Sequence, residues 1–413
     1  MARPLKILHL ANHKSTNIGN GALIAGLERV LTEDFETPLE FTAEPWDDYT
    51  IPDASKRFGR SFVELCHGHD CLLVGAAVTM DGYERYPKTG MRFHLDLDLW
   101  DEIRCPIVFY GISHRTWRGA PYHHLEQLGR TIRFALEHHR VWFSVRNDGT
   151  REWLENQFGL PSDAIREVPD PATFVPTRPM EWPLLRPSGP NIAVSLNDED
   201  VEQRFARADV SRVRRAFLER LPRKRRKRAL AKLSGHEKRR RSFLESLAEV
   251  LDQLAKQHDA NVILCPHHLE DHQMVADLGR RAPSRLKHQV LTANWLPRAD
   301  QAPVFYDLYR RVDLVCAMRI HAMSPALGLG TPTIALSSQS RITSFMERTE
   351  LSKLCLDIFS PSFARDLGSL AGEILESPDV YRERIRKAMT QLRDEARAAN
   401  HEVERFILEK QKP

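Results

Sequence analysis

The 413-residue sequence has no apolar run long enough to cross a bilayer and no large excess of either charge. A spanning helix needs about 20 consecutive apolar residues, so an integral membrane protein is not expected. The formal net charge is +4, from 60 basic and 56 acidic residues, which gives little support for a nucleic-acid partner. The N-terminus lacks the hydrophobic stretch and cleavage site of a signal peptide. We therefore expect a cytoplasmic protein.

Cysteine is also scarce, and its spacing argues against two kinds of site. The six cysteines are scattered and several lie inside apolar runs, which favours reduced thiols over a disulfide framework. The segment CHGHDC at 66–71 holds two Cys and two His, but its spacing matches no common zinc signature. No metal site is expected. The glycines at 19–21 form neither GxGxxG nor a P-loop, so they do not indicate a nucleotide site.

Short apolar runs recur along the chain, each followed by a polar turn and then a helical pattern. They lie at 6–11, 71–77, 106–112 and 141–146 in the first half, and at 191–196, 261–266, 313–318 and 333–337 in the second. Between them, as in 22–31 and 243–257, apolar residues recur at i, i+3, i+4 and i+7. Strands that alternate with helices indicate parallel sheets covered on both faces. The sequence therefore predicts an α/β fold with two doubly wound, Rossmann-like domains.

A proline-rich segment without periodicity, 176–190, predicts the domain boundary. It separates an N-terminal domain (1–175) from a C-terminal domain (191–377), which a charged helix (378–413) follows. We expect this helix to pack back across both domains. The densely basic segment 221–242 interrupts the second domain and has two interpretations. It is a solvated helical insertion, or a peripheral patch that meets anionic headgroups or a lipid-linked acidic glycan. Without interleaved aromatic residues it gives no support for nucleic-acid binding.

Candidate site residues follow from where ligands bind in open parallel sheets. They bind beyond the carboxyl ends of the strands, beside helix N-termini. The informative residues are therefore the polar ones directly after each apolar run. They are Asn17, Gly19 and Asn20 after the first run, His114 after the third, Arg146 at the end of the fourth, and Arg319 and His321 after the seventh.

Each of these residues also has a structural interpretation. Asn17 is a suitable cap for the next helix, and Gly19 is compatible with a tight turn. The segment around His114 is equally consistent with a surface loop. Arg146 leaves a buried strand and needs an anion, which is either a protein carboxylate or a ligand.

Arg319 and His321 are two residues apart, so in an extended backbone both side chains project to one side. Ser324 then suits the N-cap of the following helix. In this arrangement the pair provides an anion-binding fork and a proton carrier beside a helix N-terminus. The structural alternative pairs Arg319 with Asp307 or Asp313 and makes His321 a capped core residue.

Three blocks of the sequence resemble the polysaccharide pyruvyl transferase family. They are MRIHAMSPALGLGTPTIAL (318–336), SVRNDGT with VPDPATF (144–174), and NIGNGAL (17–23). They appear in the family's order and span most of the chain. The resemblance implies two doubly wound domains that face each other across a cleft, similar to GT-B glycosyltransferases.

The resemblance also implies the chemistry. The family moves the enolpyruvyl unit of phosphoenolpyruvate onto a sugar diol, forming a pyruvate ketal and phosphate without metal or redox cofactor. The acceptor is a sugar or glycan, either free or lipid-linked. By position, His321 is the general acid or base, and Arg319 and Arg146 clamp the donor. Arg341 stands near the place of a family lysine and is expected to join this clamp.

The N-terminal domain is expected to hold the acceptor. Asn17, Gly19, Asn20 and His114 are therefore implied as substrate-binding residues. Asn20 replaces an aspartate of the family, and 75–82 is poorer in glycine than the family pattern. Two alternatives stay open: a GT-B-type glycosyltransferase that uses a nucleotide sugar, and an inactive relative that binds glycans or anions.

Overall fold

The structure is a computed structural model of the chain. It describes residues 3–50, 54–82, 86–117, 122–162, 164–205, 235–287, 290–293 and 298–411. Of the basic segment 221–242, all but 235–242 lies outside the described residues, so both interpretations of that segment stay predictions.

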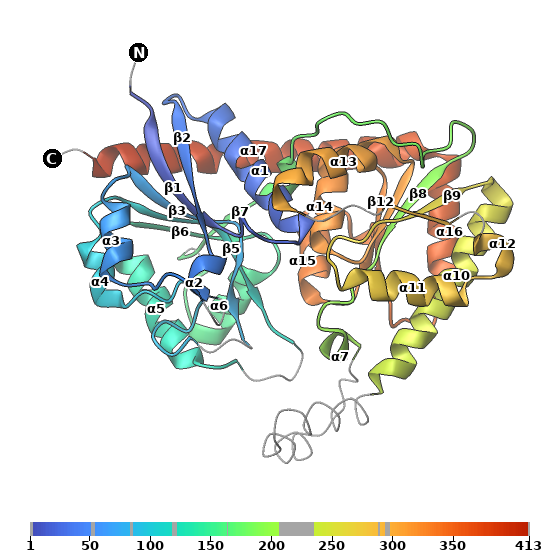
Figure 1. Cartoon of the computed structure of the whole chain (residues 1–413), viewed down its shortest axis with the longest axis horizontal. Coiled ribbons are helices and arrows are strands. Elements are labelled where there is room, and N and C mark those ends of the chain that lie inside the picture. The colour runs from blue at the N-terminus through green and yellow to red at the C-terminus, as the bar shows by residue number, and fades with distance from the viewer. Residues whose placement is uncertain are drawn as a thin grey trace.

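The N-terminal half forms a seven-stranded sheet with its helices (Figure 1). Its elements are β1 (Leu5–Ala11), α1 (Ile18–Asp34), β2 (Leu39–Pro45), α2 (Asp47–Thr50), α3 (Arg60–Cys66), β3 (Cys71–Gly75), β4 (Val78–Asp81), α4 (Leu97–Glu102), β5 (Ile107–Arg115), α5 (Leu125–Glu137), β6 (Val141–Arg146), α6 (Thr150–Phe158), β7 (Arg166–Val168) and the 3-10 turn η1 (Pro171–Phe174).

The C-terminal half forms a second sheet, of six strands. Its elements are β8 (Asn191–Ser195), α7 (Val201–Arg204), α10 (His236–His258), β9 (Asn261–Leu264), α11 (Asp271–Arg281), α12 (Ser284–Lys287), β10 (Val290–Thr292), η2 (Ala299–Gln301), α13 (Ala302–Arg311), β11 (Leu314–Ala317), α14 (Ile320–Gly328), β12 (Thr333–Ser337), α15 (Ser340–Arg348), η3 (Ser352–Leu354), β13 (Cys355–Asp357), α16 (Phe363–Glu376) and α17 (Pro378–Lys410).

Every strand pairing in both sheets is parallel. The first sheet has the order β2-β1-β3-β5-β6-β7, with β4 beside β5, and the second has the order β10-β9-β8-β11-β12-β13. The chain direction along the sheet reverses between β1 and β3 in the first, and between β8 and β11 in the second. Ligands of doubly wound sheets bind at such switch points. The loops after β8 and β11 are therefore the first place to look for a site.

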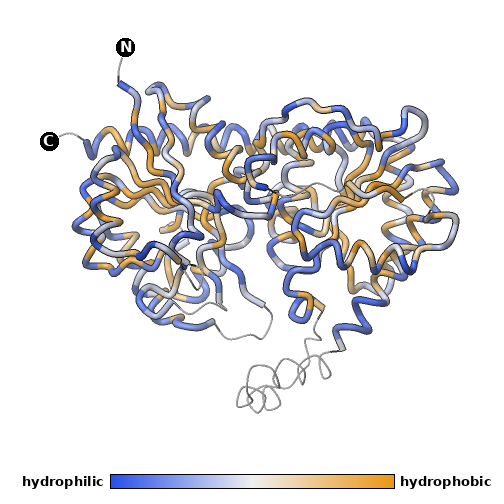
Figure 2. Tube along the Cα trace, in the orientation of Figure 1, coloured by the Kyte–Doolittle hydropathy of each residue, from blue (hydrophilic) through white to orange (hydrophobic). Residues whose placement is uncertain are grey.

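Alternating residues of the first sheet pack into two different cores. Phe109 and Phe143 face a cluster made with α3 to α5, whereas Tyr110 and Trp142 face a cluster shared with α1 and the C-terminal domain. In Figure 2 the hydrophobic stretches gather along the strands of both sheets, and hydrophilic stretches lie outside them. Because one core runs through both halves, the two domains are packed as a unit.

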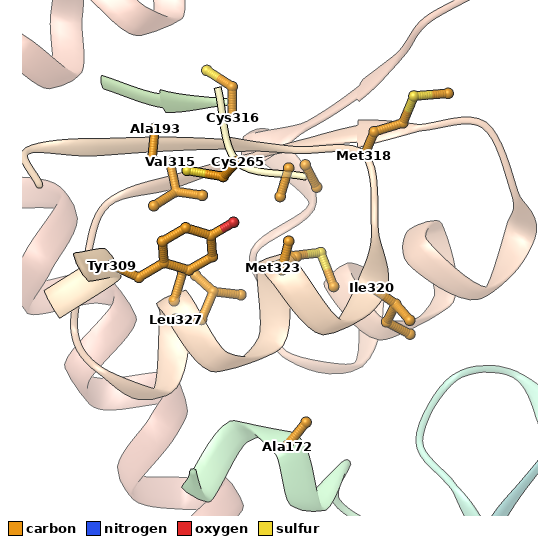
Figure 3. Close-up of a cluster of buried hydrophobic side chains, with 14 of the residues drawn as sticks. Ala172, Ala193, Cys265, Tyr309, Val315, Cys316, Met318, Ile320, Met323 and Leu327 are labelled. Carbon is orange, nitrogen blue, oxygen red and sulfur yellow. The ribbon is translucent and has the colours of Figure 1, made fainter. Parts of the chain in front are cut away.

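Helix α14 lies at the junction of the domains. Figure 3 shows Met323 and Leu327 on this helix near the strands of the second sheet, with Ala172 of η1 beyond the helix. Gly328 permits this approach, because a Cβ there would lie 1.7 Å from the carbonyl oxygen of Thr173. The N-terminal domain is thus held directly against α14.

The last helix, α17, runs along both halves of the molecule (Figure 1). On the N-terminal domain, Asn400 accepts a hydrogen bond from the Tyr110 hydroxyl at 2.7 Å and donates to Asp34 at 2.8 Å. Arg393 holds both oxygens of the same Asp34 carboxylate, at 2.6 and 2.7 Å. Burial opposes ionisation of Asp34, but these donors outweigh it and lower its pKa. The expected packing of this helix across both domains is confirmed.

All eight strands expected from the apolar runs are present. The strands that the sequence did not predict are β2, β4, β7, β10 and β13, most of which are short or lie at sheet edges. The capping of the first helix by Asn17 is confirmed, since α1 begins at Ile18. The expected start of α14 near Ser324 was wrong, because this helix begins at Ile320.

Candidate functional site

The centre of the site is a contact between the two domains. Arg146, the last residue of β6, places Nη1 at 2.9 Å from Nε2 of His321 at the start of α14. A carboxylate oxygen of the buried Asp170 lies 3.7 Å from the same Nε2. Because a guanidinium can only donate, Nε2 accepts and the proton of the neutral imidazole is on Nδ1.

The local sequence explains why His321 takes this position. Pro325 lies four residues further on and has no N–H to bond the carbonyl of His321. The backbone departs from helical geometry at His321 (φ −87°, ψ 16°), and the Tyr306 hydroxyl donates to its free carbonyl. From the other domain, Gly19 packs on the ring-bearing carbon, since a Cβ there would lie 2.7 Å from His321 Cβ. The imidazole is thus held from both domains.

Positive charge dominates around the pair formed by Arg146 and His321. Burial, followed by the positive fields of Arg146, Arg341 and Arg319, lowers the pKa of His321 well below its usual value. The imidazole is therefore neutral at pH 7. Arg146 is 0% exposed and its Nη2 has no hydrogen-bond partner in the described structure. Such a buried, unpartnered donor is suited to an anion.

Arg319 is engaged differently from His321. Its Nε and Nη2 donate to both oxygens of Asp271, at 2.8 and 2.6 Å, and its Nη1 donates to Glu199 at 3.1 Å. Asp271 begins α11, and Glu199 lies in the loop after β8, so Arg319 ties together three strand ends. Burial opposes its charge, but these two carboxylates raise its pKa further.

The expectation that Arg319 and His321 share one extended segment was wrong, because α14 begins between them. The structural alternative for Arg319 was wrong in its partners. Asp307 instead pairs with the two arginines at the end of α13, and Asp313 accepts from the backbone of Asn191.

Glu199 links the two domains. Its carboxylate accepts from Arg319 of its own domain at 3.1 Å and from Arg115, at the end of β5, at 2.9 Å. Arg115 also pairs with Asp81 at 2.5 Å. Burial would raise the pKa of Glu199, but Arg319, Arg115 and Arg204 lower it to about 2. Glu199 is therefore ionised throughout the physiological range.

Two further arginines resemble Arg146 in having no carboxylate partner among the described residues. Arg341 contacts the Ser113 hydroxyl at 3.4 Å. Arg204 is 4% exposed, donates to the Ser338 hydroxyl at 2.8 Å, and stacks over a tryptophan ring at 5.2 Å. Burial, then the field of Arg319, lowers the pKa of Arg204 to about 9. Burial also lowers the pKa of Arg341, which lies in the fields of Arg146 and Asp148.

The predicted acceptor-side residues lie at varied places. His114 is buried in the N-terminal domain, where it stacks on Trp153 at 4.6 Å and contacts the Thr150 hydroxyl at 2.9 Å. Burial lowers its pKa to about 4. Asn17 caps α1 by accepting from the backbone of Gly19 at 2.9 Å. Asn20 donates to Ser15 Oγ at 2.8 Å, and the space over Gly19 is filled by His321.

Several residues of this charged cluster were missed from the sequence. Asp170 lies in the VPDPATF block but was not predicted as a site residue, and neither were Glu199, Arg204 and Asp271. The same rule would have found Glu199 and Asp271, because NDED at 197–200 follows β8 and the HHLED segment at 267–271 follows β9. The polar residues after every strand, acidic ones included, are therefore candidates for a site.

Other kinds of site find no support in the described part of the chain. No group of three or more potential ligands there is arranged to hold a metal. His67 and His69 of the CHGHDC segment contact backbone carbonyls at 2.9 and 3.0 Å. A cavity of about 540 Å³ lies between α1, α14 and α17, but none of the predicted site residues lines it. Among the described helices, none is long and apolar enough to cross a membrane.

Two parallel α/β sheets, with a buried charge cluster where their strand ends meet, define a two-domain protein of GT-B-like architecture. The sequence model described as "Polysaccharide pyruvyl transferase" matches residues 17–340. The chain belongs to this family and is a transferase. No curated protein sequence is significantly similar to it.

The chain is similar in fold to solved structures at low identity. UDP-GlcNAc 2-epimerase from Neisseria meningitidis has a TM-score of 0.54 and 12% identity, over 98% of this chain and 100% of that one. A putative UDP-N-acetylglucosamine 2-epimerase from Listeria monocytogenes has a TM-score of 0.54 and 13% identity, over 94% and 91%. The glycosyltransferase SnogD from Streptomyces nogalater has a TM-score of 0.47 and 13% identity, over 98% and 100%. At these identities the similarity concerns the fold alone.

Proposed function

We propose that this transferase moves the enolpyruvyl unit of phosphoenolpyruvate onto a sugar diol of a glycan or glycan precursor. The product is a pyruvate ketal, and phosphate is released. The observation that carries this proposal is the set of arginines without carboxylate partners among the described residues. Arg146 and Arg204 are buried and Arg341 is half-buried; Arg146 and Arg341 act on His321, and Arg204 lies in the field of Arg341. Phosphoenolpyruvate has a carboxylate and a phosphate, which is mostly doubly charged above its second pKa of about 6. Three guanidinium groups match that charge.

The reaction needs a proton at one carbon and an electrophilic centre at its neighbour. Protonation of the methylene carbon C3 makes C2 electrophilic, and a sugar hydroxyl bonds to C2 as it loses its proton. The C2–O bond to phosphate then breaks, and the neighbouring hydroxyl bonds to C2 and closes the ketal as its proton passes to the departing phosphate. We assign the proton transfer to His321. We assign the clamping of phosphate and carboxylate to Arg146 and Arg341, because charge that develops on the leaving phosphate needs positioned donors.

Arg319 has a different part in this proposal. Asp271 and Glu199 occupy its Nε, Nη1 and Nη2. We assign it to holding the loops after β8 and β9 in place rather than to clamping the donor. The acceptor is proposed to lie on the side of the N-terminal domain.

Calorimetric titration with phosphoenolpyruvate and with UDP-GlcNAc tests the donor. We expect phosphoenolpyruvate to bind and Arg146→Gln to weaken it about 10- to 100-fold, since a charge-assisted hydrogen bond contributes about 1.5–3 kcal/mol. Arg365→Gln is the matched control, because Arg365 is 80% exposed and pairs only with Asp366 among the described residues. Binding of the nucleotide sugar without phosphoenolpyruvate would instead support glycosyl transfer. Phosphoenolpyruvate that binds, but releases no phosphate with any sugar diol, would support the inactive relative.

A further inference from the structure

The His321 ring lies between a cation and an anion that compete for one nitrogen. Arg146 Nη1 is 2.9 Å from Nε2, and Asp170 Oδ2 is 3.7 Å from it. The first distance is a hydrogen bond and the second is slightly too long for one. As long as Arg146 donates to Nε2, this nitrogen carries no proton and cannot donate to Asp170.

The other groups facing His321 favour the neutral ring. Arg341 of α15, Arg319 before α14 and His267 after β9 all lower its pKa, after burial and Arg146. The N-terminus of α1 packs on it through Gly19 and adds partial positive charge. Tyr306 of α13 contacts only the backbone carbonyl. Asp170 is the carboxylate that the described residues place within ion-pair distance of the ring.

Asp170 is itself held ready for a donor. One of its oxygens accepts from the backbone of Ala172 at 3.0 Å, and Oδ2 accepts from the Ser324 hydroxyl at 3.1 Å. A carboxylate oxygen can accept more than one hydrogen bond, so Oδ2 can also accept from His321. Burial raises the pKa of Asp170 against the opposing field of Arg146. A cationic neighbour would therefore stabilise its charged form.

An anion bound to Arg146 changes this balance. The unpartnered Nη2 offers the first hydrogen bond, and the ligand's negative charge cancels the positive field that Arg146 exerts on His321. A guanidinium that turned its N–H groups towards the ligand would leave Nε2 free. A ring movement of less than about 1 Å brings Nε2 within hydrogen-bond distance of Asp170.

We propose that Asp170 is a positioning residue that makes His321 take up one proton when an anionic donor binds to Arg146. In the free protein His321 is neutral and accepts from Arg146. In the complex it is an imidazolium that donates through Nε2–H to Asp170. The proton comes from bulk water, one for each anion bound. This inference rests on the proposed function for the identity of the donor. With Nε2–H donated to Asp170, the imidazolium keeps an acidic proton on Nδ1, which is the proton assigned to the methylene carbon of phosphoenolpyruvate.

Calorimetry in HEPES and in Tris at pH 7.5 measures the proton directly, because the two buffers differ in ionisation enthalpy. We expect between half a proton and one proton to be taken up per phosphoenolpyruvate in the wild type. His321→Gln should bind phosphoenolpyruvate without uptake. Asp170→Asn should reduce the uptake at least threefold, and Asp170→Glu should restore it. Phosphoenolpyruvate that binds the wild type without proton uptake, or equal uptake in Asp170→Asn, would overturn the inference.

A second measurement needs no variant of Asp170. In ¹⁵N-histidine-labelled protein, the resonances that His321→Gln removes should report an Nδ1–H tautomer without ligand and an imidazolium with it. Sulfate, a dianion that carries no proton near neutral pH, separates this inference from the proposed function. If only sulfate binds and is accompanied by proton uptake, the donor assignment fails and the proton coupling stands. If neither anion binds, both fail.

Discussion

Gly19→Ala tests whether His321 is held in place by the N-terminal domain. A Cβ at Gly19 would lie 2.7 Å from His321 Cβ and 3.1 Å from Oδ1 of Asn17, whereas ordinary contacts are 3.4–4 Å. Either α1 or α14 must therefore move by about 1 Å. Overpacking of this kind costs about 1–3 kcal/mol of stability.

A gain in helix propensity partly offsets this cost, so a matched control is needed. Gly279 also lies near one end of a helix, in α11, but a Cβ there would meet nothing within 4 Å. Gly279→Ala should stabilise the protein by about 0.5–1 kcal/mol, because alanine loses less backbone entropy than glycine. The difference between the two variants then isolates the overpacking penalty, which we expect to be about 1–3 kcal/mol.

Urea unfolding of both variants, followed by tryptophan fluorescence and fitted with one model, gives that difference. The histidine resonance assigned to His321 should also shift in Gly19→Ala and stay unchanged in Gly279→Ala. If the two variants differ by less than about 0.5 kcal/mol, well below the expected overpacking cost, and the resonance does not move, then α1 does not position His321.

The structure also predicts the effects of Glu199→Gln, of Asn400→Ala, and of a double-mutant cycle. Glu199→Gln should destabilise the protein by about 1–3 kcal/mol at pH 7, a range discounted for partial exposure of the carboxylate. Because the pKa of Glu199 is lowered to about 2, this difference should be full above about pH 4.5 and should shrink as the pH falls towards 2; a difference that grows in acid would contradict the assignment. Asn400→Ala should cost about 2–4 kcal/mol, since it leaves the buried Tyr110 hydroxyl without an acceptor and removes one of the hydrogen bonds to Asp34, which keeps those from Arg393. In a double-mutant cycle with Tyr110→Phe, the two losses should be less than additive, and full additivity in urea unfolding would exclude the pairing.

Much of the fold follows from the sequence because buried parallel strands are apolar along their whole length. The contact between Arg146 and His321, 175 residues apart, also has a simple origin. Arg146 ends a strand and His321 follows one, and in facing doubly wound domains the strand ends meet. Short edge strands such as β10, with its half-exposed residues, do not leave that apolar signal.

The partners of Arg319 could not be predicted from local sequence. The direction of its side chain depends on where α14 begins. That start depends on Pro325, which cannot bond the His321 carbonyl, so that Tyr306 of another helix donates to it instead. The burial of His114 under Trp153 likewise depends on how α6 packs against β5. Side-chain direction at the end of an element is set by tertiary contacts. The acceptor, the cytoplasmic location and the absence of a cofactor stay predictions.

Because α17 lies late in the chain, its contacts with the N-terminal domain form late during synthesis. The acceptor of the Tyr110 hydroxyl, Asn400, is synthesised 290 residues after Tyr110. At about 5–20 residues per second, the ribosome needs roughly 15–60 s to reach it. Throughout that interval the face of β5 and β6 that carries Tyr110 and Trp142 lacks the contacts that Asn400 and Glu402 of α17 make with it. The N-terminal domain therefore gains its last contacts only after the C-terminal sheet has been made, and until α17 is made the growing chain exposes surface that can aggregate.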